Sequence, residues 1–425
     1  MNVKINNLFD WIKKEGGFIH PNVSHTSINN ISKLILSEKM GGKGVNIISI
    51  PEKLKITGGD YLHHNFDTSS LTDIEMEYFN QPFFKLIVNL INEKLKGKKS
   101  YYYPFISTLP SMESIIRDYK NPIFFYSESQ IKKEWEKILP SIIFKLDNLN
   151  SFYINIHVTI EKLDIFNINT RNFPGYDKSE DVLKTLTLWA FLIVNNFALE
   201  KTYLLPLFNL MHYTPDTENK MILDDKNRIN FNFCDIESNE ISINNGILDN
   251  ETLYSLYGYI NFANVRYLEI KLSEKYKLED ETVRPKVEET FEKHFDRKVQ
   301  KYYLSEKIPS PSLIQYLRIL SLSERDLHII EGDKEYFTKF ISMDNEIGVY
   351  KKLLKIVRKK HEYLKKHDTS NKPIEKVSGV RELKVILKEQ IDIVKSIYYQ
   401  ICQKWVNILE EPYPENGLKS IFKLE

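Results

Sequence analysis

The sequence predicts an α+β fold in which short, irregular strands surround a long helical insertion and an all-α part follows. Apolar residues alternate with polar ones between residues 229 and 233 and again between 241 and 243, as in short, half-buried strands. From about Leu272 onward this alternation nearly vanishes and apolar residues recur at helical spacing. Short strands separated by long helical stretches argue against a parallel, doubly wound sheet.

Length and composition are those of an ordinary folded protein with more than one core. The chain has 425 residues, which suggests two or three domains. It is 42% hydrophobic and 28% charged, and 59 basic residues are matched by 58 acidic ones. Because this balance leaves no global field for nucleic acid, any charged binding surface must be local.

Cysteine usage indicates a reducing compartment. Cys234 and Cys402 are the only two cysteines of the sequence, too few for a disulfide framework or a zinc site of four thiolates. The first residues, MNVKINNLFDWIKK, lack the apolar core and cleavage site of a secretory signal. We expect a protein of the cytoplasm or nucleus.

The longest apolar run, Leu186–Val194, predicts a buried helix that begins near Ser179 as its N-cap residue. A membrane span needs about 20 apolar residues, and this run is shorter. Lys184 precedes it and two asparagines follow it. We therefore expect a core helix and no membrane contact.

Further along the chain, residues 224–227 (DDKN) predict a turn between two strands. Helices are predicted over Val287–Leu304 and Gly348–Lys366, where apolar residues recur at helical spacing with dense charge between them. The basic segment Lys351–Lys366 has two interpretations. It is a solvated helix face, which such lysine-rich helices usually are, or it docks onto an acidic or RNA-containing surface of a partner.

Two segments carry the most informative pattern, LLPLFNLMHYTP (Leu204–Pro215) and ISINNGILDNETLYSLYGYI (Ile241–Ile260). Together they resemble the closing half of the active site of SET-domain methyltransferases. The resemblance is to the branch that includes rubisco large-subunit methyltransferase and the actin-histidine methyltransferase. The family's catalytic tyrosine precedes the glycine that corresponds to Gly246, and Asn, Glu and Leu follow it as Asn250, Glu251 and Leu253.

Other segments resemble the same family in the same order. Those before the closing half are Gly41–Thr57, Leu95–Ser111 and Asn121–Trp135. After it, Pro311–Leu327 and Val380–Val394 resemble the helical substrate-binding domain of this branch. The resemblance thus implies a SET domain over residues 1–270, with its helical insertion at about 76–180, and a helical C-terminal domain over 271–425.

The resemblance also implies S-adenosylmethionine (SAM) as the cofactor, without a metal. In the family, backbone of the opening segment contacts SAM, which here corresponds to Gly42, Lys43 and Gly44. A second contact corresponds to His212 and Tyr213, partly through backbone. At Asn196 the family has an arginine, whose guanidinium could hold the carboxylate of SAM by a forked contact.

Several chemical residues of the family are exchanged. Asn245 stands at the catalytic tyrosine, Asn209 at an aspartate, and His212-Tyr213 at Asn-His. Asn245 and His212-Tyr213 also have plain structural interpretations, since Asn-Asn-Gly is good turn chemistry and the His-Tyr pair can be a satisfied, partly buried polar pair. Of the tyrosines that could replace the missing one, Tyr213 is the most interesting.

The other two candidate tyrosines are Tyr254 and Tyr257, and Tyr257 is expected to pack in the core. Two functions follow from the resemblance. The first is a degenerate protein methyltransferase, with weak or no catalysis, that acts as a protein-binding module. The second is an active SAM-dependent methyltransferase that modifies a lysine or histidine of an intracellular protein. The exchanges favour the first, because they affect cofactor and chemistry while the retained motifs are mostly architectural.

Overall fold

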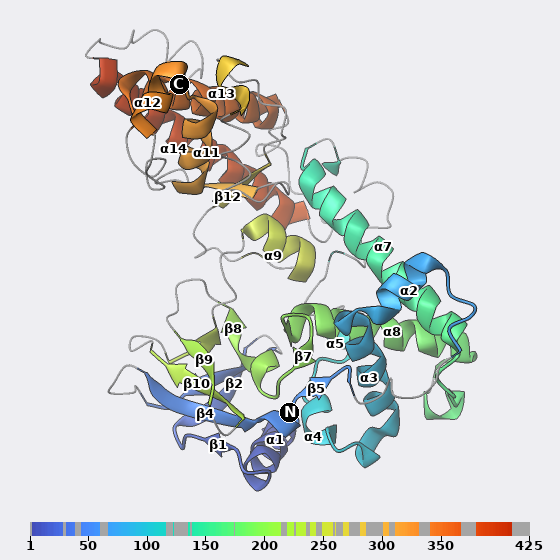
Figure 1. Ribbon diagram of the computed structural model, residues 1–425. Helices are drawn as coiled ribbons and strands as arrows, with labels where there is room; N and C mark the ends of the chain where they lie inside the picture. The colour runs from blue at the N-terminus through green and yellow to red at the C-terminus, as the bar shows by residue number, and fades with distance from the viewer. Residues whose placement is uncertain are drawn as a thin grey trace. The chain divides into compact units, whose positions relative to one another are not determined.

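The computed structural model divides the chain into two units (Figure 1). The first comprises Met1–Glu136, Pro140–Leu248 and Thr252–Ile260, and the second Lys137–Leu139, Asp249–Glu251 and Asn261–Glu425. The structure describes residues 2–28, 31–38, 44–59, 67–115, 122, 135–136, 138–173, 175–213, 219–224, 227–234, 239–243, 249–257, 260, 267–271, 281–285, 301–305, 311–330, 341–366 and 380–409.

The largest sheet of the first unit is antiparallel and has the strand order β1-β4-β10-β9 (Figure 1). Its strands are β1 (Phe18–Ile19), β4 (Val45–Pro51), β9 (Lys220–Leu223) and β10 (Arg228–Phe233). Burial in β10 alternates along the strand, which confirms the half-buried strand predicted there. The backbone N of Asp224 donates to the Arg228 carbonyl oxygen at 2.9 Å, and Asn227 has φ +54°, so the predicted turn joins β9 to β10.

The remaining sheets of this unit are small. They are the hairpin β2 (Val23–Ile28) with β3 (Ile31–Leu36), the three strands β5 (Ile56–Thr57), β7 (Tyr203–Leu204) and β6 (Ala198–Leu199), and the parallel pair β8 (His212–Tyr213) with β11 (Ser242–Ile243). Such short, separate sheets confirm the mixed fold that the sequence predicts.

Helices supply most of the rest of the first unit. They are α1 (Asn2–Lys14), α2 (Asp73–Asn80), α3 (Pro82–Lys96), α4 (Tyr103–Ile106), α5 (Met112–Ser114), α7 (Pro140–Leu163), α8 (Ser179–Phe197) and α9 (Asn250–Tyr257), whose first two residues belong to the second unit. Phe83 of α3 lies 5.1 Å from the Phe152 ring of α7 and 5.7 Å from the Phe191 ring of α8, between ring centroids. These aromatic contacts join three helices into one core.

Helix α8 contains the apolar run, which is buried as predicted. Ser179, however, is the first helical residue and not the N-cap. Lys178 occupies the N-cap position without a side-chain hydrogen bond, because an ammonium has no acceptor, and the acidic residues of the first turn favour the helix N-terminus instead. Among the described helices, none combines the length and apolarity that crossing a bilayer requires.

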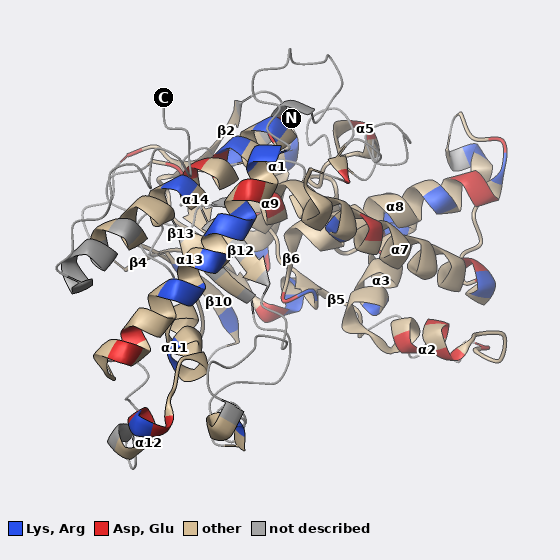
Figure 2. Cartoon of the chain, turned by 90° about the horizontal axis from the view of Figure 1, so that it is seen from above, with Lys and Arg blue, Asp and Glu red and all other residues tan. Residues whose placement is uncertain are grey.

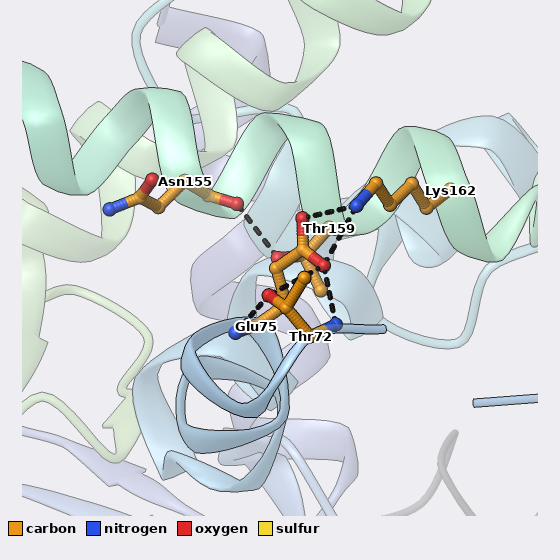
Figure 3. A network of polar contacts seen from close by, with 5 residues as sticks. All are labelled: Thr72, Glu75, Asn155, Thr159 and Lys162. Carbon is orange, nitrogen blue, oxygen red and sulfur yellow. Dashed lines mark hydrogen bonds and ion pairs between the residues drawn. The ribbon is translucent and has the colours of Figure 1, made fainter. Parts of the chain in front are cut away.

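A polar network fastens α2 to α7 (Figure 3). Thr72 and Glu75 form a capping box, in which each side chain accepts from the backbone N of the other residue. Lys162 of α7 pairs with Glu75 at 2.7 Å, and the hydrogen bond from Lys162 is the main cause that lowers the pKa of the Glu75 carboxyl. The Thr159 hydroxyl donates to the Asn155 carbonyl oxygen within α7.

The second unit is mainly helical, as predicted. Its elements are β12 (Tyr267–Lys271), β13 (Lys301–Ser305), α11 (Pro311–Leu320), α12 (Glu324–Ile330), α13 (Met343–Lys366) and α14 (Val380–Leu409). Short 3₁₀ turns of the two units lie at Glu52–Leu54, Gly97–Lys99, Thr170–Asn172, Phe208–Leu210 (η6) and Glu281–Val283.

The two-stranded sheet β12–β13 corrects one prediction. The end of the segment predicted as a helix over Val287–Leu304 is strand, paired antiparallel with β12. Tyr302 and Leu304, two residues apart, are both buried, as on one face of a strand, whereas the prediction rested on helical spacing over a longer window. Residues 287–300 lie outside the described part of the chain.

A buried ion pair joins α11 to α13. The Arg318 guanidinium donates to both Glu346 carboxylate oxygens at 3.0 Å, and both residues are buried. The Asn345 amide also donates to the Arg318 carbonyl oxygen at 2.9 Å. A forked contact of this kind fixes the relative orientation of two helices.

Candidate cofactor site

The centre of the first unit contains a strained turn in the segment Leu204–Pro215. Leu207 is fully buried and has φ +72°, in the left-handed region, directly before the 3₁₀ turn η6 (Phe208–Leu210). A leucine in that region costs roughly 1–2 kcal/mol, which packing of the surrounding core must offset. Backbone strain of this kind clusters at functional sites.

The strand that follows η6 meets the second motif of the sequence. In the parallel pair β8–β11, His212 lies opposite Ser242 and Tyr213 opposite Ile243. On its other side, the segment before β11 pairs with β3, where the backbone N of Leu36 donates to the Asn239 carbonyl oxygen at 2.7 Å. The chain leading to Asn245 therefore runs between β3 and β8.

Asn219 links the backbone of β11 to the end of β10, and it was not predicted from the sequence. Its buried amide donates to the Ser242 carbonyl oxygen at 2.8 Å and accepts from the backbone N of Cys234 at 2.7 Å. One side chain thus holds β11 beside the end of β10. No local signal could have found it, because Asn219 stands in a polar stretch typical of loops.

Asn209, at the family's aspartate position, contacts another of the resembling segments. It is buried, and its Nδ2 donates to the Thr108 carbonyl oxygen at 3.3 Å. A carboxylate at this position could only accept, and would face another acceptor, so the exchange to an amide fits its surroundings. Trp189 of α8 donates to the neighbouring Pro110 carbonyl oxygen at 2.8 Å.

The C-terminal end of α8 holds a second polar cluster. Asn195 is buried, and its Nδ2 donates to the Leu256 carbonyl oxygen of α9 at 3.1 Å and to Asn196 Oδ1 at 3.3 Å. The Lys201 Nζ donates to the Asn195 carbonyl oxygen at 2.5 Å and to its Oδ1 at 3.1 Å. Asn196 stands at the position where the resemblance implies a guanidinium. The Lys201 ammonium contacts the residue directly before it, Asn195.

Lys201 lies in the tight turn between β6 and β7. Glu200 and Lys201 have φ +50° and +59°, and the Thr202 backbone N donates to the Leu199 carbonyl oxygen at 2.9 Å. Asn-Gly is the usual sequence for such a turn, so Glu-Lys gave no signal for it. Burial lowers the pKa of the Lys201 ammonium to about 8.

The opening segment is described only from Gly44 onward. Gly44 has φ +77°, and its backbone N donates to the Phe233 carbonyl oxygen at 2.9 Å. No atom lies within 4 Å of an added Cβ, so the positive φ and not crowding favours glycine here. Gly42 and Lys43 lie outside the described residues.

The candidate tyrosines are only partly placed. Asn245 and its neighbours 244–248 lie outside the described residues, and only the backbone of His212 and Tyr213 is described. Tyr254 is buried on α9, and burial raises the pKa of Tyr257.

The start of α9 has an architectural role in the second unit. Asn250 donates to both Glu389 carboxylate oxygens of α14 at 3.1 and 2.9 Å, and Gln390 donates to Glu251 at 2.9 Å. All four residues are buried. These contacts explain the Asn and Glu of the motif without assigning them any chemistry.

The basic helix divides into two sets of side chains. Figure 2 shows Lys and Arg along α13. Those exposed to solvent are Lys351, Lys355, Arg358, Lys359, Lys365 and Lys366. Lys352 is buried, Lys360 is partly buried with its pKa lowered mainly by burial, and Arg358 pairs with Glu362 at 2.9 Å. Within the described part of the chain, no His, Cys, Asp and Glu side chains gather in a way that could hold a metal ion.

Comparison with known proteins gives the fold. No protein-family model and no curated protein matches the sequence. Among solved structures, the SET domain of LSMT bound to methyllysine and AdoHcy matches with a TM-score of 0.58 and 17% identity, over 99% of this chain and 96% of that chain. Rubisco LSMT bound to AdoMet matches with a TM-score of 0.57 and 18% identity, over 99% and 97%.

The chain has the SET-domain fold. A third match, rubisco LSMT bound to sinefungin and monomethyllysine, has a TM-score of 0.58 at 17% identity and covers 100% of this chain and 97% of that chain. Since these matches span both units, they confirm the predicted fold class, a SET domain followed by a mainly helical part.

Proposed function

We propose that this protein binds SAM and a protein partner, and that it transfers methyl groups much more slowly than a SET site with a tyrosine at residue 245. The observation that carries the proposal is the backbone of the closing half. Leu207 has a strained conformation and β8 pairs with β11, while the side chains that the resemblance implies for the chemistry are exchanged.

The proposed SAM site comprises the backbone at Gly44 and along β8, together with Asn196 at the end of α8. The strained, buried backbone of Leu207 and the partly buried Lys201, which contacts Asn195, are features of a ligand site more than of a plain core. When bound, SAM supplies an electrophilic methyl group for in-line transfer to a neutral nitrogen, and the protein aligns the two.

Slow transfer follows from the side chain at residue 245. A phenol hydroxyl there would orient the accepting nitrogen and shape the electrostatics around the departing charge. Asn245 is shorter and has no phenol. Removing one such positioned polar group costs on the order of 10²–10³ in rate.

The partner is proposed to be a protein of the cytoplasm or nucleus. Two of the matching structures contain methyllysine or monomethyllysine, which suggests lysine as the side chain recognised, with histidine as the alternative. The helical second unit would hold a folded region of that partner. The exposed side chains of α13 are proposed to be a solvated face, since Arg358 already has an acidic neighbour on the same helix.

Methyl-labelled SAM and a cell lysate test the proposal. We expect little label in protein with the wild type, and an increase of tenfold or more for Asn245→Tyr, because the substitution restores the phenol. Asn244→Tyr, one residue earlier in the sequence, is the matched control and should not increase labelling. Rapid labelling by the wild type, with no gain for Asn245→Tyr, would contradict the proposal.

One observation favours the second function, an active methyltransferase. The pairing of β8 with β11 brings the backbone of Tyr213 beside Ile243, two residues before Asn245. If Tyr213 provides the missing hydroxyl, Tyr213→Phe abolishes labelling that the wild type performs. Unchanged labelling in Tyr213→Phe excludes that role.

A further inference from the structure

Lys201 is a partly buried cation whose described contacts are all neutral. Its Nζ donates to Asn195 O and Oδ1, and it lies 6.0 Å from the centroid of the Phe83 ring. No described carboxylate lies within ion-pair distance of this ammonium. Desolvating an ammonium without an anion is costly, and the cost is offset when an anionic ligand binds beside it.

A second lysine near the same small sheet shows the contrast. Lys55 precedes β5, which pairs with β7, and its Nζ lies 5.0 Å from the centroid of the Tyr203 ring. Lys55 nevertheless has an acidic partner, Glu52, at 2.5 Å. Lys55 therefore has an anionic partner, whereas the described acceptors of Lys201 are neutral.

The ammonium of Lys201 also keeps capacity for another contact. An ammonium carries three N–H donors, and two described acceptor atoms, both on Asn195, occupy two of them. The tight turn at Glu200 and Lys201 and the capped end of α8 hold it in place. A donor that is already oriented binds a ligand oxygen with little further loss of entropy.

We propose that Lys201 binds the carboxylate of the amino-acid part of SAM, an inference that rests on the proposed function. The carboxylate is the anionic group of SAM, and Lys201 contacts the residue before Asn196, where the resemblance implies a lost guanidinium. In this chain the cation that binds the carboxylate of SAM is Lys201 of the β6–β7 turn, in place of an arginine at residue 196 near the end of α8. In this site Lys201 is a binding residue and takes no part in the transfer.

A purely structural role makes a different prediction. Lys201 also satisfies a carbonyl oxygen in the last turn of α8, as basic residues at helix C-termini do. Loss of that cap would weaken every ligand of the site equally. The two roles are separated by a ligand that lacks only the carboxylate.

Calorimetric titration with SAM and with decarboxylated SAM provides that test. We expect Lys201→Gln to weaken the binding of SAM by about 10- to 100-fold, which corresponds to the loss of a charge-assisted hydrogen bond. The same substitution should weaken the binding of decarboxylated SAM by less than about twofold. Lys201→Arg keeps the charge and should retain most of the affinity for SAM. Equal losses for the two ligands would overturn the proposal and leave Lys201 as a helix cap.

Lys55→Gln is the matched control, since Lys55 lies near the same sheet but is already paired. It should change neither affinity by more than about twofold. Thermal unfolding of each variant verifies that it is folded before titration. If the wild type binds SAM and Lys201→Gln binds it equally well, only this inference fails, whereas absence of SAM binding by the wild type rejects the proposed function itself.

Discussion

Lys201 couples folding stability to pH at the scale of a single residue. Burial lowers the pKa of its ammonium from 10.5 to about 8, and its described contacts, Asn195 and the Phe83 ring, are neutral. Glu200, next in the chain, is not among the causes of this shift. Between about pH 8 and 10.5 the unfolded chain retains a proton that the folded chain has released, so the free energy of unfolding rises with pH.

Urea unfolding of the wild type and of Lys201→Met at pH 7.5 and 9.5 measures this coupling. We expect the wild type to gain roughly 1–2 kcal/mol relative to the variant over this range, because other titrating groups cancel in the difference. If the free energy of unfolding changes equally with pH in the two proteins, the Lys201 ammonium is not desolvated in the folded state.

At the scale of elements, the buried pair Arg318–Glu346 joins α11 to α13. We expect Glu346→Ala to lower the free energy of unfolding by about 3–5 kcal/mol, because it leaves a buried guanidinium without its anion. The matched control is Glu362→Ala, which breaks the exposed pair with Arg358 on the same helix and should cost less than about 0.5 kcal/mol. Denaturant titration of both variants measures the difference, and similar losses would contradict the buried pair.

Elements with a clear period could be predicted from the sequence. The alternation in β10 and the long apolar run of α8 both have one dominant period, and both are found where expected. Strand β13 could not be predicted in this way, because its five residues follow a longer stretch with helical spacing. Its pairing with β12 is a contact between distant parts of the sequence, which local periodicity does not contain.

For the whole molecule, the order of motifs predicted the SET fold although the solved structures with that fold are only 17–18% identical. The candidate site was predicted less completely. The resemblance implied that the segments Leu204–Pro215 and Ile241–Ile260 belong to one site, and the pairing of β8 with β11 brings the described backbone of the two segments together. Asn219 and Lys201 were missed, since each acts through a contact that only the folded chain creates.

The proposed function and the role of Lys201 both require that the protein binds SAM. Calorimetric titration of the purified wild-type protein with SAM, and with its demethylated product as a second ligand, tests it most directly. We expect saturable binding of SAM in the micromolar range. No detectable binding at millimolar SAM would contradict it, and would leave this chain as a SET-fold interaction module without a cofactor.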